Sequence, residues 1–139
     1  MKNMVLQIAK AIIVQNDRFL LQLRDDSVDI LYPNQWSFFG GEVELDETPW
    51  QALQRELEEE LEWRPKQGYF LYPWINPEYL CRIHFFTVHF EGKASQLILH
   101  EGQEMGWFNF NELVEVKSMA FHVKQHTINA INFLNNNLH

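Results

Sequence analysis

The sequence has only one cysteine, Cys81, among its 139 residues, so no disulfide bond can form within the chain. Proteins without disulfides are typical of reducing compartments. The N-terminus shows no basic segment followed by an apolar run and a cleavage site. The apolar runs are also far shorter than the roughly 20 residues that cross a bilayer. We therefore expect a soluble, cytoplasmic protein with no membrane partner.

Basic residues are scarce as well. The chain has 11 Lys and Arg against 19 Asp and Glu, and its formal net charge is −8. Proteins that bind a nucleic-acid backbone normally present a basic face to it. The composition therefore argues against RNA or DNA as a partner. A small anionic substrate stays compatible with it, provided that a metal cation or a few arginines reach that substrate.

The length fits one domain, residues 1–139, and a hydrophobic content of 46% can form a packed core. Apolar and alternating runs predict strands at 5–14, 18–24, 36–39, 69–75, 79–90 and 107–108. The first two strands form a hairpin around Asn16-Asp17. Helices are predicted at 48–61 and 121–134, with a helical turn opened by Asn109 and Glu112. This order predicts an α/β (α+β) fold with helices on the faces of a mixed sheet.

The helix at 48–61 has the clearest pattern. Thr48 is a suitable N-cap, Pro49 suits the first helical position, and Gln51 completes a capping box. An apolar stripe of Trp50, Leu53, Leu57 and Leu61 is expected to pack on the sheet.

Glu56, Glu59 and Glu60 share an adjacent arc of roughly 100° on this helix. Like charges at such spacings repel by roughly 0.2–0.5 kcal/mol per pair, and the C-terminal half of a helix disfavours anions. A bound divalent cation would turn this repulsion into attraction. The alternative is a solvated acidic face, which is the commoner explanation of an acidic helix.

Gly40-Gly41 follows the strand at 36–39 and precedes the acidic helix. Glycine permits a positive φ and close backbone approach, so this turn can bring backbone groups beside the carboxylates. An ordinary tight turn is the alternative.

Together these segments resemble the Nudix box, G-x5-E-x7-R-E-U-x-E-E-x-G-U. The matching residues are Gly41, Glu47, Arg55, Glu56, Leu57, Glu59, Glu60 and an apolar Trp63. The flanks at 20–24, 36–41, 101–103 and 107–108 are similar to the family too, so the resemblance covers most of the chain. It implies a Nudix-type α/β/α sandwich with a central mixed β-sheet.

The resemblance also implies a Mg²⁺-dependent hydrolase, with Mn²⁺ as an alternative metal. The substrate would be a nucleoside diphosphate linked to another moiety, such as a nucleoside triphosphate, a sugar nucleotide or ADP-ribose, and one product would be a nucleoside monophosphate. The implied metal ligands are the Gly40 carbonyl and the carboxylates of Glu56, Glu59 and Glu60.

Other roles follow from the same resemblance. Arg55 and Glu47 would pair to orient the loop and helix, and Gly41 would be structural. Clustered carboxylates titrate as a set, but one of them has to accept the proton of the attacking water. We favour Glu59 or Glu60 for this, with Glu101 as the rival, since some members supply an extra carboxylate from a loop.

Substrate contacts are less specified. Arg24 can fork onto phosphate oxygens or be a surface residue of its strand. Phe38 and Phe121 can stack on a base or belong to the core. His122 lies in the segment that reads the base in MutT-type members, but residues 118–122 lack the Pro-Pro-Ala-Asn pattern associated with oxidised guanine. A homodimer is compatible with the sequence.

Two departures from the family stand out. Phe39 replaces a common proline, and Glu62 replaces the late glycine, so we expect the helix to end in another way, near Pro65. Two other functions remain. A catalytically silent nucleotide-sensing module would be expected to have damaged carboxylates, and isopentenyl-diphosphate isomerase needs a cysteine and a second metal site, for which only Cys81 is present.

Overall fold

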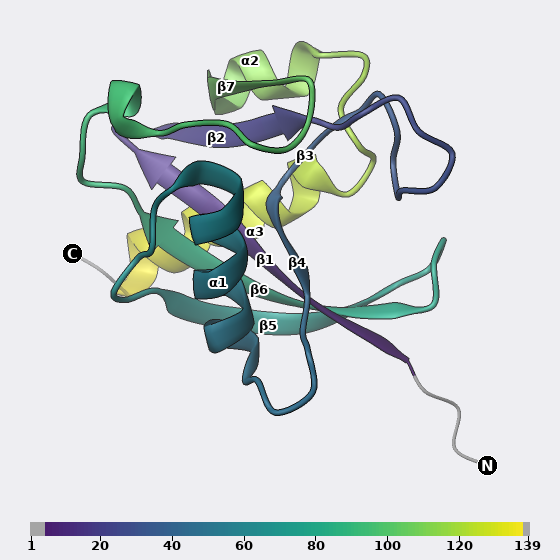
Figure 1. Cartoon of the computed structure of the whole chain (residues 1–139). Helices are drawn as coiled ribbons and strands as arrows, with labels where there is room; N and C mark the ends of the chain where they lie inside the picture. Colours follow the sequence, from purple (N-terminus) through teal and green to yellow (C-terminus); the bar gives the residue numbers. More distant parts are fainter. Residues whose placement is uncertain (1–4, 138–139) are drawn as a thin grey trace.

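The computed structural model describes residues 5–137 (Figure 1). Its elements are β1 (Leu6–Gln15), β2 (Arg18–Leu23), β3 (Trp36–Ser37), β4 (Phe39–Glu42), α1 (Pro49–Leu61), β5 (Tyr69–Asn76), β6 (Cys81–His89), the 3-10 helix η1 (Ala94–Gln96), β7 (Glu104–Asn109), α2 (Phe110–Glu115) and α3 (Val123–Asn137). The predicted elements are all present, with shifted ends, and the short η1 was not predicted. The strand predicted at 36–39 is divided into β3 and β4, and Gly40-Gly41, which were predicted as a turn, lie within β4. Asn16 and Asp17 form the hairpin turn with φ of 50° and 61°, as the left-handed turn of a tight hairpin requires.

The strands form one mixed sheet in the order β3-β2-β1-β6-β5, with β4 also paired to β1 and β7 to β2. β1 and β6 are parallel, and the other pairs are antiparallel. β1 changes partner along its length. Its first half, from Ile8 to Ala11, pairs with β4, whereas Ile13 to Gln15 pair with β2. The sheet therefore opens between β2 and β4, beside the middle of β1.

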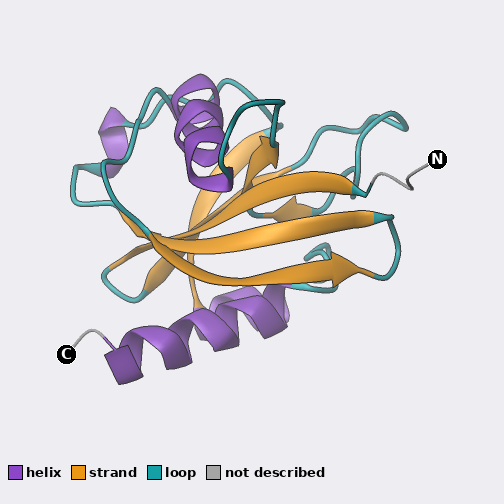
Figure 2. Cartoon of the chain, turned by 90° about the horizontal axis from the view of Figure 1, so that it is seen from below, coloured by secondary structure: helices purple, strands orange, loops and turns teal. Residues whose placement is uncertain are grey.

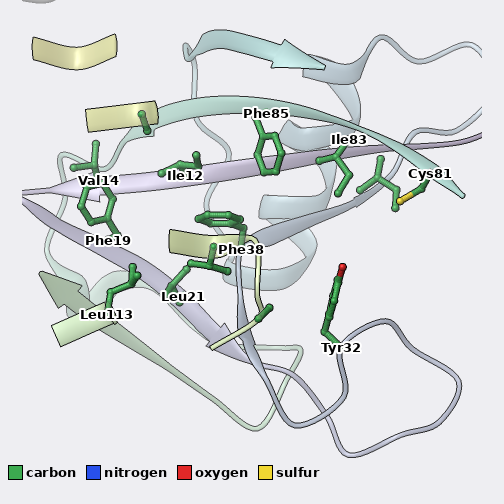
Figure 3. Close-up of a cluster of buried hydrophobic side chains, with 14 residues drawn as sticks. Ile12, Val14, Phe19, Leu21, Tyr32, Phe38, Cys81, Ile83, Phe85 and Leu113 are labelled. Atoms are coloured by element: carbon green, nitrogen blue, oxygen red, sulfur yellow. The ribbon is translucent and has the colours of Figure 1, made fainter. Parts of the chain in front are cut away.

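Helices cover both faces of the sheet, with α1 on one face and α3 on the other (Figure 2). The core is accordingly divided into two clusters. The cluster under α1 includes Ala9, Leu53 and Leu57. The cluster under α3, drawn in Figure 3, includes Ile12 and Phe38. The predicted α/β/α sandwich with a central mixed sheet is confirmed.

The N-terminus of α1 follows its prediction. Thr48 is the N-cap, its side chain accepts a hydrogen bond from Gln51 N, and the capping box is complete. The apolar stripe packs on the sheet as expected, with Leu53, Leu57 and Leu61 fully buried.

The expected end of α1 near Pro65 was wrong. The helix ends at Leu61, and Glu62 takes the left-handed conformation, with φ 56° and ψ 35°, that the family's glycine would adopt. Two backbone groups of a later loop satisfy exposed carbonyls at this end: Ile98 N donates to Leu61 O at 3.2 Å, and His100 N donates to Glu60 O at 2.8 Å. The His100 ring also pairs with the Glu62 carboxylate. The helix can therefore end in this way without a glycine.

None of the helices in residues 5–137 is long and apolar enough to span a membrane.

Candidate active site

Three carboxylates converge at one end of α1. Glu56 and Glu60 are one helical turn apart, and Glu101 reaches them from the loop before β7; one oxygen of each lies within 4.8 Å of the others. Glu60 is only 3% exposed, although it carries a carboxylate. Burial raises the pKa of Glu60 well above its ordinary value, and the hydrogen bond with Glu101 raises it further. Burial also raises the pKa of Glu56. We call these three residues the carboxylate cluster.

The two glycines of β4 make room for the carboxylate cluster. A Cβ on Gly41 would lie 2.4 Å from the carboxyl carbon of Glu56. Gly40 has φ of +140°, and a Cβ there would lie 2.0 Å from the Ala9 carbonyl oxygen of β1. The Gly40 N–H donates to Glu60 Oε2 at 3.2 Å. Close backbone approach, one of the two sequence-based explanations of Gly40-Gly41, therefore applies at both positions.

Arg55 connects α1 to the loop that precedes it. Its Nε and Nη2 donate to the two oxygens of Glu47 at 2.7 and 2.9 Å, and its Nη1 donates to Glu56 Oε1 at 2.9 Å. A further bond from Nη2 reaches Glu42 O at 3.0 Å. The bidentate bond from Arg55 lowers the pKa of Glu47 to about 2. The single bond from Nη1 holds Glu56 by one oxygen and leaves its second oxygen outside this bond.

The loop that carries Glu101 is fixed on both sides of that residue. Before it, His100 N binds the end of α1, and after it Gln103 N donates to Leu23 O at 2.8 Å. Between these bonds, Gly102 has φ of +88°, and a Cβ there would lie 2.8 Å from Leu23 O. The loop therefore crosses the end of β2 closely enough to bring Glu101 to Glu60.

Glu59 lies outside the carboxylate cluster. Its side chain is 60% exposed, and its Oε2 lies 3.6 Å from Arg55 Nη1. The sequence places Glu59 on the same arc as Glu56 and Glu60, but in the structure its carboxylate is turned towards the guanidinium of Arg55. Glu101, by contrast, joins the cluster from a segment about 40 residues away in the chain.

Besides Arg55, two further described cations lie near the carboxylate cluster, and sequence reasoning identified only one of these two. Arg24 follows β2, and its Nε donates to Leu31 O at 2.6 Å. Lys10 lies on β1, and its Nζ donates to Phe38 O at 3.2 Å. Glu60 and Glu101 act electrostatically on both. The signal for Lys10 was a single basic residue within the apolar run 5–14, which was predicted only as the first strand of a hairpin.

A cluster of aromatic rings, called here the aromatic cluster, packs near these cations, between β5, β6 and the start of α3. Its members are Tyr32, Phe38, Trp74, Phe85, Phe121, His122 and His126. His122 is 4% exposed and stacks on Trp74 with ring centroids 5.5 Å apart. Its Nδ1 has no hydrogen-bond partner among the described residues. Burial lowers the pKa of His122 to about 3 and that of His126 to about 4, so both rings are neutral at neutral pH.

The two aromatic residues singled out from the sequence differ in position. Phe38 is fully buried against Phe85 and His122, and Figure 3 shows its ring within the core. A base could stack on Phe38 only if the ring moved. Phe121 is 54% exposed and lies against Tyr32 and His122. Trp74 and His126 were missed, because an aromatic residue in a strand and a histidine in a helix resemble core residues in sequence.

The carboxylate cluster fits a divalent cation of the Mg²⁺ type. Such ions prefer carboxylate oxygens, and Glu60 is buried without an ion pair to any described lysine or arginine within 4.0 Å. A buried carboxylate in this position is costly unless a cation or a proton neutralises it. The site therefore has carboxylates that suit a metal ion, with Lys10 and Arg24 near them.

Comparison with known proteins agrees with this geometry. Residues 5–129 match the family model described as the NUDIX domain. The chain is 31% identical over 111 residues to the CTP pyrophosphohydrolase of Escherichia coli strain K12, covering 80% of this chain and 81% of that protein.

Solved structures share the fold over nearly the whole chain. The solution structure of the E. coli ORF135 protein has a TM-score of 0.73 and 26% identity, covering 96% of this chain and 93% of the other. The NUDIX domain of Shewanella oneidensis NrtR, crystallised with ADP ribose, has a TM-score of 0.78 and 16% identity, covering 96% and 90%. The predicted resemblance is confirmed by the match of the domain, the curated relative and the fold, and the chain belongs to the Nudix family of pyrophosphohydrolases.

Proposed function

We propose that the protein is a Mg²⁺-dependent pyrophosphohydrolase that cleaves a nucleoside triphosphate to the nucleoside monophosphate and pyrophosphate, with CTP as the first candidate substrate. The observation that carries the proposal is the carboxylate cluster of Glu56, Glu60 and Glu101 beside two cations. CTP is the first candidate because the E. coli relative that is 31% identical is a CTP pyrophosphohydrolase. Mn²⁺ is expected to replace Mg²⁺.

Glu56 and Glu60 are the proposed protein ligands of the metal, together with the Gly40 carbonyl. When bound, the metal supplies neutralisation of the diphosphate oxygens and a lower pKa for water. Other residues of the chain hold the two carboxylates in position. Arg55 holds Glu56 by one oxygen, and the Gly40 N–H holds Glu60 by Oε2, so each carboxylate keeps one oxygen outside these bonds.

Glu101 is the proposed acceptor of the water proton. Its carboxylate is exposed to solvent and lies next to Glu60, whereas Glu60 is buried and bound to Gly40. A base needs access to water and to the reacting phosphorus, and this requirement favours Glu101 over Glu60. Glu59 stays a candidate, because a small side-chain rotation could free its carboxylate from Arg55.

The nucleoside is proposed to lie at the exposed edge of the aromatic cluster, against Phe121 and near His122. A neutral imidazole with an unpartnered Nδ1 can accept or donate one hydrogen bond at the edge of a base. Arg24 has unused guanidinium nitrogens for phosphate oxygens, since Nε alone has a partner among the described residues.

The test is hydrolysis of a nucleotide panel with Mg²⁺, covering the four ribonucleoside triphosphates, a sugar nucleotide and ADP-ribose, with products separated by chromatography. The expected result is CMP and pyrophosphate from CTP, with no turnover in EDTA. Glu56→Gln should lower kcat by about two orders of magnitude or more, as expected for loss of a metal carboxylate.

Glu58→Gln is the matched control, because Glu58 is exposed on the same helix and lies outside the carboxylate cluster. Its kcat should equal that of the wild type. If ADP-ribose alone were cleaved, it would replace CTP as the proposed substrate, and the proposed mechanism would stand. Tight binding without any turnover across the panel would refute the proposal and indicate a nucleotide sensor.

A further inference from the structure

Lys10 lies where a structural lysine is unexpected. It belongs to the central strand β1, and in the sheet register it is opposite Gly40 on one side and Phe85 on the other. Its neighbours on the same face of the strand, Ile8 and Ile12, are buried, and Lys10 itself is half-buried. A lysine in such a place costs free energy unless its charge meets an opposite charge.

The contacts of Lys10 do not account for its charge. Its Nζ donates to the Phe38 carbonyl at 3.2 Å, which Gln22 Nε2 also approaches at 3.4 Å. An ammonium group has three donors and no acceptor. Among the described residues it makes one hydrogen bond, and no carboxylate lies within ion-pair distance of it. Two of its donors are therefore available.

Several charged groups of the site act on Lys10. The carboxylates of Glu60, Glu101 and Glu56 favour its charged form, whereas Arg24 opposes it. Burial is the largest effect and lowers the pKa of Lys10 to about 8. Lys10 also acts on His122, since its charge helps to lower the pKa of that ring. The contacts agree, because Lys10 is paired with Gly40, whose N–H donates to Glu60, and its Nζ donates to Phe38 O. The ammonium thus lies near the carboxylate cluster and near the aromatic cluster.

We propose that Lys10 is a substrate-binding residue whose ammonium donates to phosphate oxygens at the border between the carboxylate cluster and the aromatic cluster. This inference rests on the proposed function, because it needs a substrate with an anionic diphosphate beside the cluster. A bound phosphate supplies the opposite charge that the protein itself does not place in contact with Nζ. Arg24 approaches the same region from β2, so the two cations form a pair that faces one anion.

The competing explanation is that Lys10 supports the Phe38 carbonyl and does nothing else. The two explanations predict opposite changes in the affinity for Mg²⁺ when Lys10 is replaced. Removing a cation next to three carboxylates should strengthen metal binding, because the carboxylates lose a competing charge, and should weaken phosphate binding. Loss of a mere structural support should weaken both and lower the thermal stability.

The experiment compares the wild type with Lys10→Met, Lys10→Arg and the exposed control Lys66→Met. Calorimetry measures the affinity for Mg²⁺ alone and for inorganic pyrophosphate with Mg²⁺, thermal unfolding measures stability, and KM and kcat are measured with CTP. Lys10→Met should weaken pyrophosphate binding about tenfold to a hundredfold, the range of a charge-assisted hydrogen bond. Its Mg²⁺ affinity should be equal or tighter. Lys10→Arg should recover most of the loss, and Lys66→Met should match the wild type.

Unchanged pyrophosphate affinity and KM in Lys10→Met would overturn the inference. Parallel losses of Mg²⁺ affinity, pyrophosphate affinity and stability would overturn it too, in favour of the structural explanation. No measurable pyrophosphate binding by the wild type would count against it in the same way. Lys10-dependent pyrophosphate binding without turnover of any nucleotide would instead leave the inference standing and refute the proposed hydrolase.

Discussion

Glu60→Gln tests whether the carboxylate cluster costs stability. Glu60 is 3% exposed, lies beside Glu56 and Glu101, and has only one backbone N–H, that of Gly40, as a hydrogen-bond donor from the main chain. Glutamine has nearly the same shape and keeps a carbonyl oxygen for that N–H. The substitution therefore removes the titrating carboxyl group with little change in packing. We expect the metal-free variant to be more stable than the wild type at neutral pH and to lose its turnover.

The magnitude follows from proton linkage. The pKa of Glu60 is raised in the folded protein, so the folded state keeps a proton that the unfolded state has already lost. Stability is therefore lost as the pH rises from the ordinary pKa of 4.5 towards the folded pKa. The loss is at most about 1.4 kcal/mol per pH unit, which sets a ceiling of about 3.4 kcal/mol at pH 7. A gain of about 1–3 kcal/mol should raise Tm by about 3–10 °C in a chain of this length.

The assay is thermal unfolding in EDTA between pH 4.5 and 8, for the wild type, Glu60→Gln and Glu59→Gln. The advantage of Glu60→Gln should vanish near pH 4.5 and grow with pH. Glu59 is exposed, so its variant should stay within about 0.5 kcal/mol of the wild type. Mg²⁺ should stabilise the wild type more than Glu60→Gln, because the variant lacks one proposed metal ligand and a ligand that binds the folded state stabilises it. A Glu60→Gln variant that is no more stable than the wild type at pH 7 in EDTA would refute this reasoning.

Two further predictions concern the supports of α1. Thr48→Ala removes the acceptor of Gln51 N and should cost about 1 kcal/mol of unfolding free energy. Thermal unfolding should show the loss and its recovery in Thr48→Ser, and an unchanged Tm in Thr48→Ala would contradict the capping role. Arg55→Lys removes the fork on Glu47, so the pKa of Glu47 should rise from about 2 towards 4.5, as measured by NMR titration of its carboxyl carbon, with reduced kcat. A Glu47 pKa that stays near 2 would show that the fork is not its cause.

The parts of the fold that were predicted correctly depend on local rules. The hairpin turn at Asn16-Asp17 and the capped start of α1 each follow from the conformational preferences of a few adjacent residues. The end of α1 was predicted wrongly, since the groups that satisfy its carbonyls come from residues 98–100. No local pattern around Glu62 contains that information.

The candidate site likewise contains residues that local rules predict and residues that they do not. The spacing of Glu56 and Glu60 on one helix predicted that they lie close together, and the resemblance to a family identified Glu101 as a candidate. Lys10 was not identified, because strand alternation cannot show that the sheet opens between β2 and β4 beside it. Glu59 was grouped with Glu56 and Glu60, because helical geometry places Cα atoms but does not show which way a side chain turns.

The replacement of the family's late glycine by Glu62 links the end of α1 to the carboxylate cluster. A left-handed conformation costs a residue with a side chain roughly 1–2 kcal/mol, and an ion pair as exposed as that of Glu62 with His100 returns about 0–1 kcal/mol. The pair alone therefore does not offset the strain, so the backbone bonds from Ile98 and His100 must contribute to holding this end. The residue after His100 is Glu101. Because the bonds that end α1 also fix the position of this loop, Glu101 and Glu60 are held as one unit, and a change at the end of the helix alters the distance between these two carboxylates.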